Sequence, residues 1–196
     1  MMNADSLSLA CKTWALQIKD KLSAFIIGNH DERSIKSELY DFGEEIVDLI
    51  GGAYLGYGGL LHIKFNDDLI YDIFLDHEGK GYSKYNPLHP GANADAELKF
   101  DLYVFGHIHD GVHFNDIAKK QYRRVGTIRA GGYDRPIHTR YGWKINPLGY
   151  NEPETPIILL NPYTKEYLIF RKLERGLLML HALNGEIKNE QIKILD

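Results

Sequence analysis

Cysteine is almost absent from this sequence. Of 196 residues only Cys11 carries a thiol, so neither an intramolecular disulfide nor a cysteine-rich zinc site can form. Long apolar runs are also missing, because none approaches the ~18 residues that a membrane span requires. The first residues lack the basic start and the apolar core of a signal peptide. These absences lead us to expect a cytoplasmic protein.

A strong charge of either sign is likewise lacking. The formal net charge is -4 and the pI is about 6.1, so the chain as a whole is not an electrostatic binder of nucleic acid. Affinity for phosphate must therefore come from a local patch or from a bound metal. Hydrophobic residues at 44% and charged residues at 26% are typical of one soluble globular domain of this length. Nine histidines are the excess that stands out.

Hydrophobic patterning predicts an α/β domain. Helical spacing of apolar residues predicts helices over residues 7–22, 34–50 and 92–99. Apolar and β-branched runs predict strands over 23–27, 60–65, 69–75, 102–105, 123–129, 156–160 and 166–170. The turn residues Asn66–Asp68 join two of these strands into a hairpin. No internal repeat interrupts the pattern, so we expect a single domain with much β structure.

Polar side chains directly follow three of the predicted strands. The segments are Gly28–Asp31, His77 and Gly106–Asp110. In open α/β sheets the carboxyl ends of the strands meet at one edge, where loops converge on a site. Imidazole nitrogen and amide oxygen are ligands for divalent Mn, Fe, Zn and Ni. The sequence therefore predicts a metal centre built from Asn29, His30, His77, His107 and His109.

These three segments resemble signatures of the calcineurin-like metallophosphoesterases. Gly28–Asp31 looks like the third signature, His77 like the isolated histidine of the fourth, and Gly106–His109 like the fifth. The resemblance implies a four-layer α/β/β/α sandwich, to which the β-rich tail would contribute the second half. It also implies a two-metal hydrolase that acts on a phosphomonoester or a phosphodiester.

The resemblance further implies which residues bind metal. Asn29, His77 and His107 would bind one divalent ion, and His109 would help to bind a second. Manganese is the first expectation, and iron, zinc or nickel would also suit these ligands. Paired ions about 3.5–4 Å apart would bind the phosphoryl oxygens and lower the pKa of a bridging water.

Catalytic roles follow from the same resemblance. His30 would lie near the leaving-group oxygen as a proton donor rather than bind metal, and Asp31 would hold its ring by a hydrogen bond. Arg33 is a weaker candidate for contact with the substrate phosphate. The resemblance does not identify the substrate beyond a phosphate ester.

The chain departs from the family pattern before Gly28. The first two signatures, an Asp-x-His pair and a Gly-Asp-x-x-Asp run with the metal-bridging aspartate, are not found, and Asp5 and Asp20 lie in no such motif. We therefore expect residues 1–196 to form a phosphoesterase domain that lacks the family's N-terminal strands and has impaired activity. The incomplete sheet would expose an edge for a partner or for self-association. The competing hypothesis is a noncatalytic remnant that binds metal, nucleic acid or a protein partner.

Other polar and aromatic residues have simpler explanations. A lone histidine is more often a surface or hydrogen-bonded residue than a ligand, which applies to His62, His89, His113, His138 and His181. His107-x-His109 could begin a cupin motif, but no glutamate follows it and the helical first half disfavours an all-β barrel. A basic run with Tyr122, formed by Lys119, Lys120, Arg123, Arg124 and Arg129, could contact nucleic acid, although a solvated strand face is favoured. Core packing is favoured for Tyr141, Trp143 and Tyr150.

Overall fold

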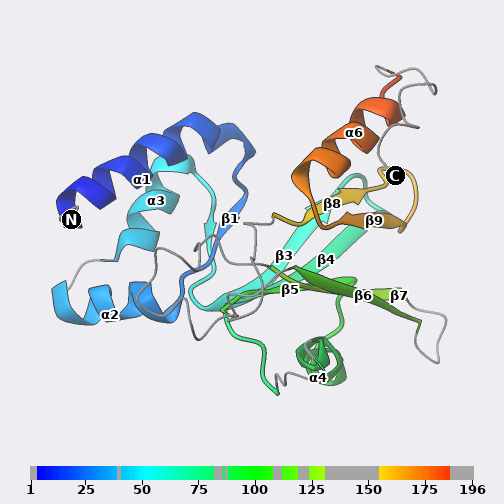
Figure 1. The fold of residues 1–196 in the computed structure, drawn as a ribbon, viewed down its shortest axis with the longest axis horizontal. Helices are drawn as coiled ribbons and strands as arrows, with labels where there is room; N and C mark the ends of the chain where they lie inside the picture. The colour runs from blue at the N-terminus through cyan, green and yellow to red at the C-terminus, as the bar shows by residue number, and fades with distance from the viewer. Residues whose placement is uncertain are drawn as a thin grey trace, which may run out of the picture. The chain divides into compact units, whose positions relative to one another are not determined.

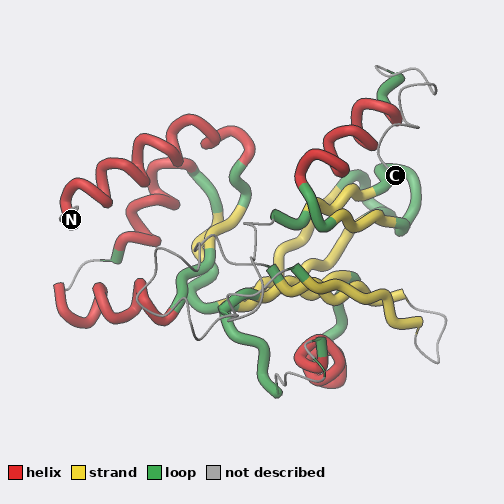
Figure 2. Tube along the Cα trace, in the orientation of Figure 1, coloured by secondary structure: helices red, strands yellow, loops and turns green. Residues whose placement is uncertain are grey.

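The computed structural model describes residues 4–38, 41–81, 86, 88–107, 112–118, 124–130 and 155–185. The chain divides into two compact units, of which the first comprises residues 1–61 and 74–78 and the second residues 62–73 and 79–196. A β-hairpin, β3 (Gly58–Lys64) and β4 (Ile70–Asp76), has residues in both units. Figure 1 shows the order of the elements, and Figure 2 separates helices from strands by colour.

The first unit is mainly helical. Its elements are α1 (Ala4–Ile18), a 3-10 turn (Lys19–Lys21), β1 (Ala24–Phe25), α2 (Asn29–Glu38), α3 (Phe42–Ile50) and β2 (Ala53–Tyr54). Helices α1 and α3 lie side by side (Figure 1), and an ion pair between Lys12 and Glu45 joins them. Strands β1 and β2 form a short parallel pair. Ala15 and Ile46 are buried on these two helices.

A polar cap fixes the start of α3. The Asp41 carboxylate accepts the backbone N–H groups of Gly43 at 2.8 Å and Glu44 at 3.2 Å, which otherwise lack intrahelical partners. It also accepts the Tyr54 hydroxyl at 2.7 Å, which ties α3 to β2. Burial and then the Asp41 carboxylate raise the pKa of Tyr54, so the hydroxyl stays a donor at neutral pH.

The second unit is built on a mixed β-sheet. Its order is β3-β4-β5-β7-β6, with β5 (Leu102–Phe105), β6 (His113–Ala118) and β7 (Arg124–Arg129). Strand β7 pairs in parallel with β5 and antiparallel with β6. Strands β8 (Ile157–Leu160) and β9 (Tyr167–Phe170) form a separate antiparallel hairpin. Figure 1 shows α4 (His89–Glu97) and α6 (Leu173–Leu183), both in this unit.

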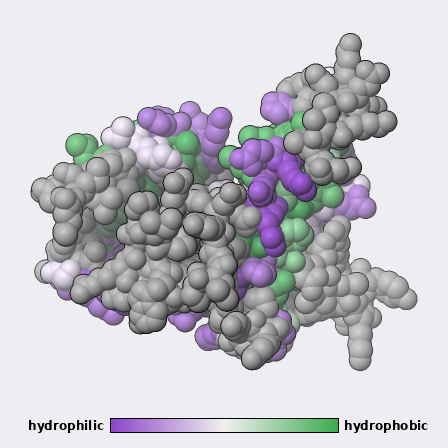
Figure 3. Space-filling view, in the orientation of Figure 1, coloured by the Kyte–Doolittle hydropathy of each residue, from purple (hydrophilic) through white to green (hydrophobic). Residues whose placement is uncertain are grey.

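The core of the second unit lies around β5 and β7. Leu102, Tyr103 and Phe105 are buried, as expected for a strand paired on both sides. Helix α4 packs closely on β7, because Gly91 lies so near Thr127 that a Cβ atom would clash. Helix α6 packs on β8 and β9, and near it hydrophobic and hydrophilic residues both reach the surface (Figure 3).

Most of the predicted elements are present. The α/β class is confirmed, as are the first helix, the hairpin at Asn66–Asp68 and the strand that ends at Phe105. The single helix predicted over residues 34–50 is wrong, because the Asp41 cap starts a new helix there. Strand β6 and helix α6 were not predicted. No described helix is long and apolar enough to cross a membrane.

Two further expectations need correction. Gly28–Asp31 was expected to lie between a strand and a helix that begins at residue 34, but α2 already begins at Asn29. The polar segments were expected at one sheet edge, yet among the described strands β1 pairs with β2 in a sheet of its own, apart from β4 and β5. The reason is the shortness of β1, whose two residues reach only β2 before the chain turns into a helix.

Tyr71 on β4 provides a test of how the second unit is held together. Its buried hydroxyl lies within reach of three carbonyl oxygens of the β8–β9 turn: 3.0 Å from Asn161, 2.5 Å from Thr164 and 2.6 Å from Glu166. Tyr71→Phe removes the donor, and we expect it to lower the free energy of unfolding by about 1–2 kcal/mol in urea denaturation. Tyr163→Phe, at an 88% exposed position of the same turn, should change nothing. Equal stability of both variants would contradict this assignment.

Candidate metal centre

The start of helix α2 carries the first group of predicted site residues. The Gly28 N–H donates to Asp31 Oδ2 at 2.8 Å, and the Glu32 N–H donates to the Gly28 carbonyl at 3.0 Å. Gly28 therefore acts as the N-cap, and Asp31 reaches back to it in the manner of a capping box. The hydrogen bond predicted between Asp31 and His30 stays a prediction. His30 itself is exposed on the first turn of the helix.

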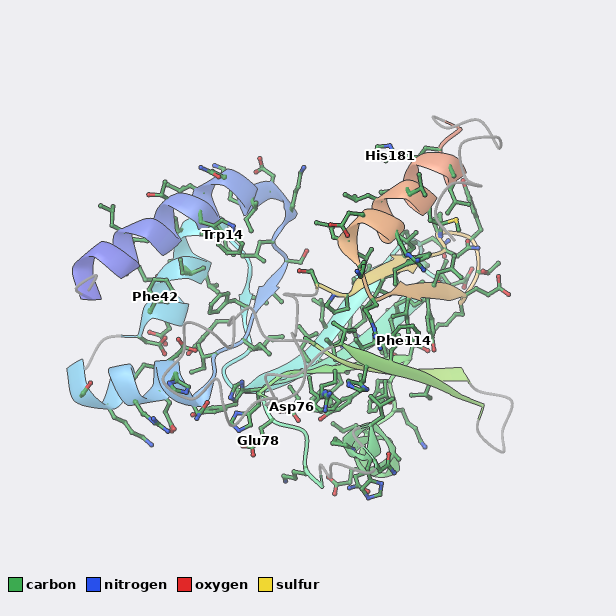
Figure 4. The ribbon with its side chains drawn as sticks, in the orientation of Figure 1. Trp14, Phe42, Asp76, Glu78, Phe114 and His181 are labelled. Atoms are coloured by element: carbon green, nitrogen blue, oxygen red, sulfur yellow. The ribbon has the colours of Figure 1, made fainter. Side chains whose placement is uncertain are left out.

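His77 lies beside Asn29, although 48 residues separate them in the chain. It follows β4, and its backbone N–H donates to the Tyr57 carbonyl at 2.8 Å. Its Nε2 lies 3.0 Å from Asn29 Oδ1 and 3.2 Å from the Asn29 backbone nitrogen. Figure 4 labels Asp76 and Glu78, the two acidic neighbours of His77 in the chain. The structure thus brings together two of the predicted ligands within the first unit.

The two contacts of His77 Nε2 make opposite demands on the imidazole. A nitrogen that accepts the Asn29 N–H carries a lone pair, which then faces the lone pairs of Asn29 Oδ1. A protonated nitrogen suits the amide oxygen but opposes the N–H group. With the amide oriented as in this structure, neither tautomer of a neutral ring satisfies both contacts.

A cation would remove the repulsion between the lone pairs of the two side chains. Two neighbouring ligand atoms, each about 2.1 Å from an ion and at a right angle, are about 3.0 Å apart. The separation of Asn29 Oδ1 and His77 Nε2 is 3.0 Å. An unprotonated Nε2 could then direct its lone pair at the ion beside Asn29 Oδ1, and this bond would replace the hydrogen bond from the Asn29 N–H. The pair of donor atoms therefore fits two adjacent positions of one coordination sphere.

Gly28 makes the close approach of His77 possible. A Cβ atom at this position would lie 2.7 Å from Cε1 and 3.0 Å from Nδ1 of the His77 ring. Such separations are too short for nonbonded carbon and nitrogen atoms. The motif at residues 28–31 contains this glycine, but its steric role becomes visible only once His77 is placed.

Sequence reasoning missed Tyr57, the other neighbour of His77. Its ring meets the imidazole edge-on, with centroids 6.0 Å apart and planes at 64°. A hydrogen bond to the Glu32 carboxylate raises the pKa of Tyr57 to about 12. Lys36, and then Tyr57, lower the pKa of Glu32. Tyr57 lies in a glycine-rich segment without helical or strand periodicity, so no sequence signal pointed to it.

The remaining predicted residues are placed as follows. His107 belongs to the second unit, follows β5 and is exposed, with a left-handed φ of 70° that is uncommon outside glycine. His109 lies outside the described residues. Arg33 is exposed on α2. Among the residues that the structure describes, no three His, Cys, Asp or Glu side chains are grouped to hold a metal ion.

Comparisons with known proteins identify no family for this chain. No family model matches it, and neither does any curated protein. Solved structures of Vps29 from Entamoeba histolytica are similar to this chain, with low sequence identity and low TM-scores. A double mutant has 13% sequence identity and a TM-score of 0.43, with 80% of this chain and 79% of that chain covered. The wild-type protein complexed with Zn²⁺ has 12% identity and a TM-score of 0.41, with 82% and 87% covered.

Gly28→Ala should separate His77 from Asn29. The added methyl group would force the imidazole away, and we expect the free energy of unfolding to fall by about 1–3 kcal/mol. In NMR spectra of the isotope-labelled chain, the nuclear Overhauser effect (NOE) between the His77 ring protons and the Asn29 amide proton should disappear. Lys36→Ala, at an exposed position of the same helix, is the control. Retention of the NOE in Gly28→Ala would contradict the close packing at this glycine.

Proposed function

We propose that this chain is a metal-dependent phosphoesterase of the calcineurin-like type, which hydrolyses a phosphomonoester or a phosphodiester. The observation that carries the proposal is the 3.0 Å separation of Asn29 Oδ1 and His77 Nε2. These are two residues for which the sequence motifs imply a common ion. Their separation fits two adjacent positions in the coordination sphere of one divalent cation.

The proposal keeps His107 and His109 as further metal ligands, an assignment that rests on the resemblance of Gly106–His109 to the fifth signature of the family. When bound, the ions would supply Lewis acidity toward the phosphoryl group and an activated water molecule. His30, exposed on the first turn of α2, would donate a proton to the leaving-group oxygen. Asp31 would act mainly by capping the helix that carries His30 and Asn29, since its carboxylate accepts the Gly28 N–H.

Metal binding is the first prediction of this function. Isothermal titration of the whole chain with Mn²⁺, and then with Zn²⁺, should show binding that Asn29→Ala and His77→Ala weaken at least tenfold. The matched control is His62→Ala, because the Nδ1 atom of His62 is already engaged by Asp72 Oδ1 at 2.6 Å. An equal loss of metal affinity in all three variants would indicate nonspecific binding by histidines and would contradict the proposed centre.

Turnover is the second prediction. The chain should hydrolyse bis(p-nitrophenyl) phosphate when Mn²⁺ is added, and His107→Ala should lose that activity, which also controls for contaminating enzymes. His30→Ala should lower kcat by about 10²–10⁴-fold and leave Mn²⁺ affinity unchanged, because its role is proton transfer. A folded, metal-binding chain without turnover would instead support the noncatalytic alternative.

A further inference from the structure

Helix α6 exposes a stripe of leucine side chains. Leu173, Leu177 and Leu180 are 43%, 42% and 40% exposed. Their spacing of four and then three residues places them on one face of the helix, and Asn184 continues the same line just past the last turn. Single exposed leucines are common on protein surfaces, whereas a contiguous apolar patch is a feature of contact surfaces.

A different face of α6 packs on the β8–β9 hairpin. Gly176 is buried against Ile157, so closely that a Cβ atom there would lie 2.6 Å from the Ile157 Cγ2 atom. Met179 and Ala182 follow at intervals of three residues on the same side and are half-buried. At 3.6 residues per turn, the leucine stripe is centred roughly 130° away from this packed face. The stripe is therefore available to another molecule.

The spacing of the stripe indicates which kind of molecule fits it. Residues 173, 177, 180 and 184 follow one another at intervals of four, three and four, the pattern of the a and d positions of a two-stranded coiled coil. A second helix with the same pattern fits this seam, and another copy of α6 has it. In an antiparallel pair with two-fold symmetry, Leu177 of one copy would lie against Leu180 of the other.

Charged side chains beside the stripe favour a second copy in this orientation. Glu174 in the first turn and His181 in the last turn (Figure 4) are both exposed, and their separation of seven residues places them on the same flank of the stripe. In an antiparallel pair this flank meets itself in reverse, so Glu174 of one copy faces His181 of the other, twice in each dimer. Parallel pairing would set the same side chains against Gly176 and Leu183.

We propose that the leucine stripe of α6 is an interface between two copies of this chain, which pair antiparallel through Leu177 and Leu180 with Glu174 and His181 at the border. The interface is independent of the candidate metal centre and of the function proposed above. A helix of 11 residues buries less than the ~800 Å² per partner of a standard interface. We therefore expect a weak dimer, with a dissociation constant on the order of 10 µM.

Sedimentation velocity of the whole chain is the first test. Concentrations from about tenfold below to about tenfold above the expected dissociation constant should convert monomer reversibly to dimer. Leu177→Glu should weaken the dimer about tenfold or more, because it places a carboxylate against Leu180 of the other copy. Leu9→Glu makes the same change at an exposed leucine of α1 and should leave the dimer unchanged. A chain that stays monomeric throughout, or an equal effect of both variants, would contradict the proposal.

A charge exchange tests the orientation even if Leu177→Glu fails to fold. Glu174→Lys and His181→Glu should each weaken the dimer about threefold, because the attraction at the border is lost. The double variant should regain the original affinity, since each lysine then faces a glutamate. Absence of this recovery would overturn the antiparallel pairing. Flotation with vesicles of phosphatidylcholine and phosphatidylglycerol covers the lipid alternative: vesicle binding by a chain that stays monomeric, lost in Leu177→Glu, would assign the stripe to a membrane surface instead.

Discussion

The approach of the His77 ring to the backbone at Gly28 and Asn29 is the contact on which the candidate centre depends. It joins the end of a long hairpin strand to the first turn of a helix 48 residues earlier. The hydrogen bond from Ile27 N–H to the Gly56 carbonyl, at 2.8 Å, and that from His77 N–H to the Tyr57 carbonyl, also at 2.8 Å, bring both segments to the Gly56–Tyr57 turn. Side-chain geometry at the centre therefore follows from backbone pairing, which is the stiffer part of the structure.

Sequence patterns sufficed for the elements that local chemistry determines. Apolar runs located β4 and β5. The hairpin turn between β3 and β4 could be predicted because the Asn66 side chain accepts the N–H groups of Asp68 and Leu69. Sequence patterns failed where a single side chain changes the course of the backbone. Asp41 starts a new helix inside a continuous apolar pattern, and that pattern carries no information on whether its carboxylate will cap.

The candidate site divides in the same way. Asn29 and His77 could be chosen from the sequence because each ends an apolar run with a ligand-type side chain. Tyr57 could not, because its contact with the His77 ring leaves no periodic pattern in the sequence. The steric role of Gly28 is also nonlocal, since the atoms that forbid a side chain there belong to His77.

Polar contacts with different degrees of burial join the elements of the second unit. Asp101 accepts the Asp72 N–H at 2.8 Å and pairs with Lys165 at 2.8 Å, while His62 contacts Asp72 at 2.6 Å. The pairs Lys165–Asp101 and His62–Asp72 each have one exposed partner, and such pairs contribute about 0–1 kcal/mol each. Tyr71 is different, because its hydroxyl is buried among carbonyls that would lose a donor. The Tyr71 hydroxyl therefore joins β4 to the β8–β9 turn.

The carboxylates near Asn29 and His77 favour the binding of a cation before the binding of a phosphate at the candidate centre. The first turn of α2 presents N–H groups whose dipole would favour an anion, but Asp31 and Glu32 already supply negative charge there. Asp76 and Glu78 flank His77 in the chain (Figure 4), and Lys36 is engaged by Glu32. These carboxylates would repel a phosphate ester at Asn29 and His77, whereas the Arg33 guanidinium on the same helix would attract it. An ion held by Asn29 and His77 would reverse the sign of the field, which makes metal dependence the expected property of any phosphate chemistry here.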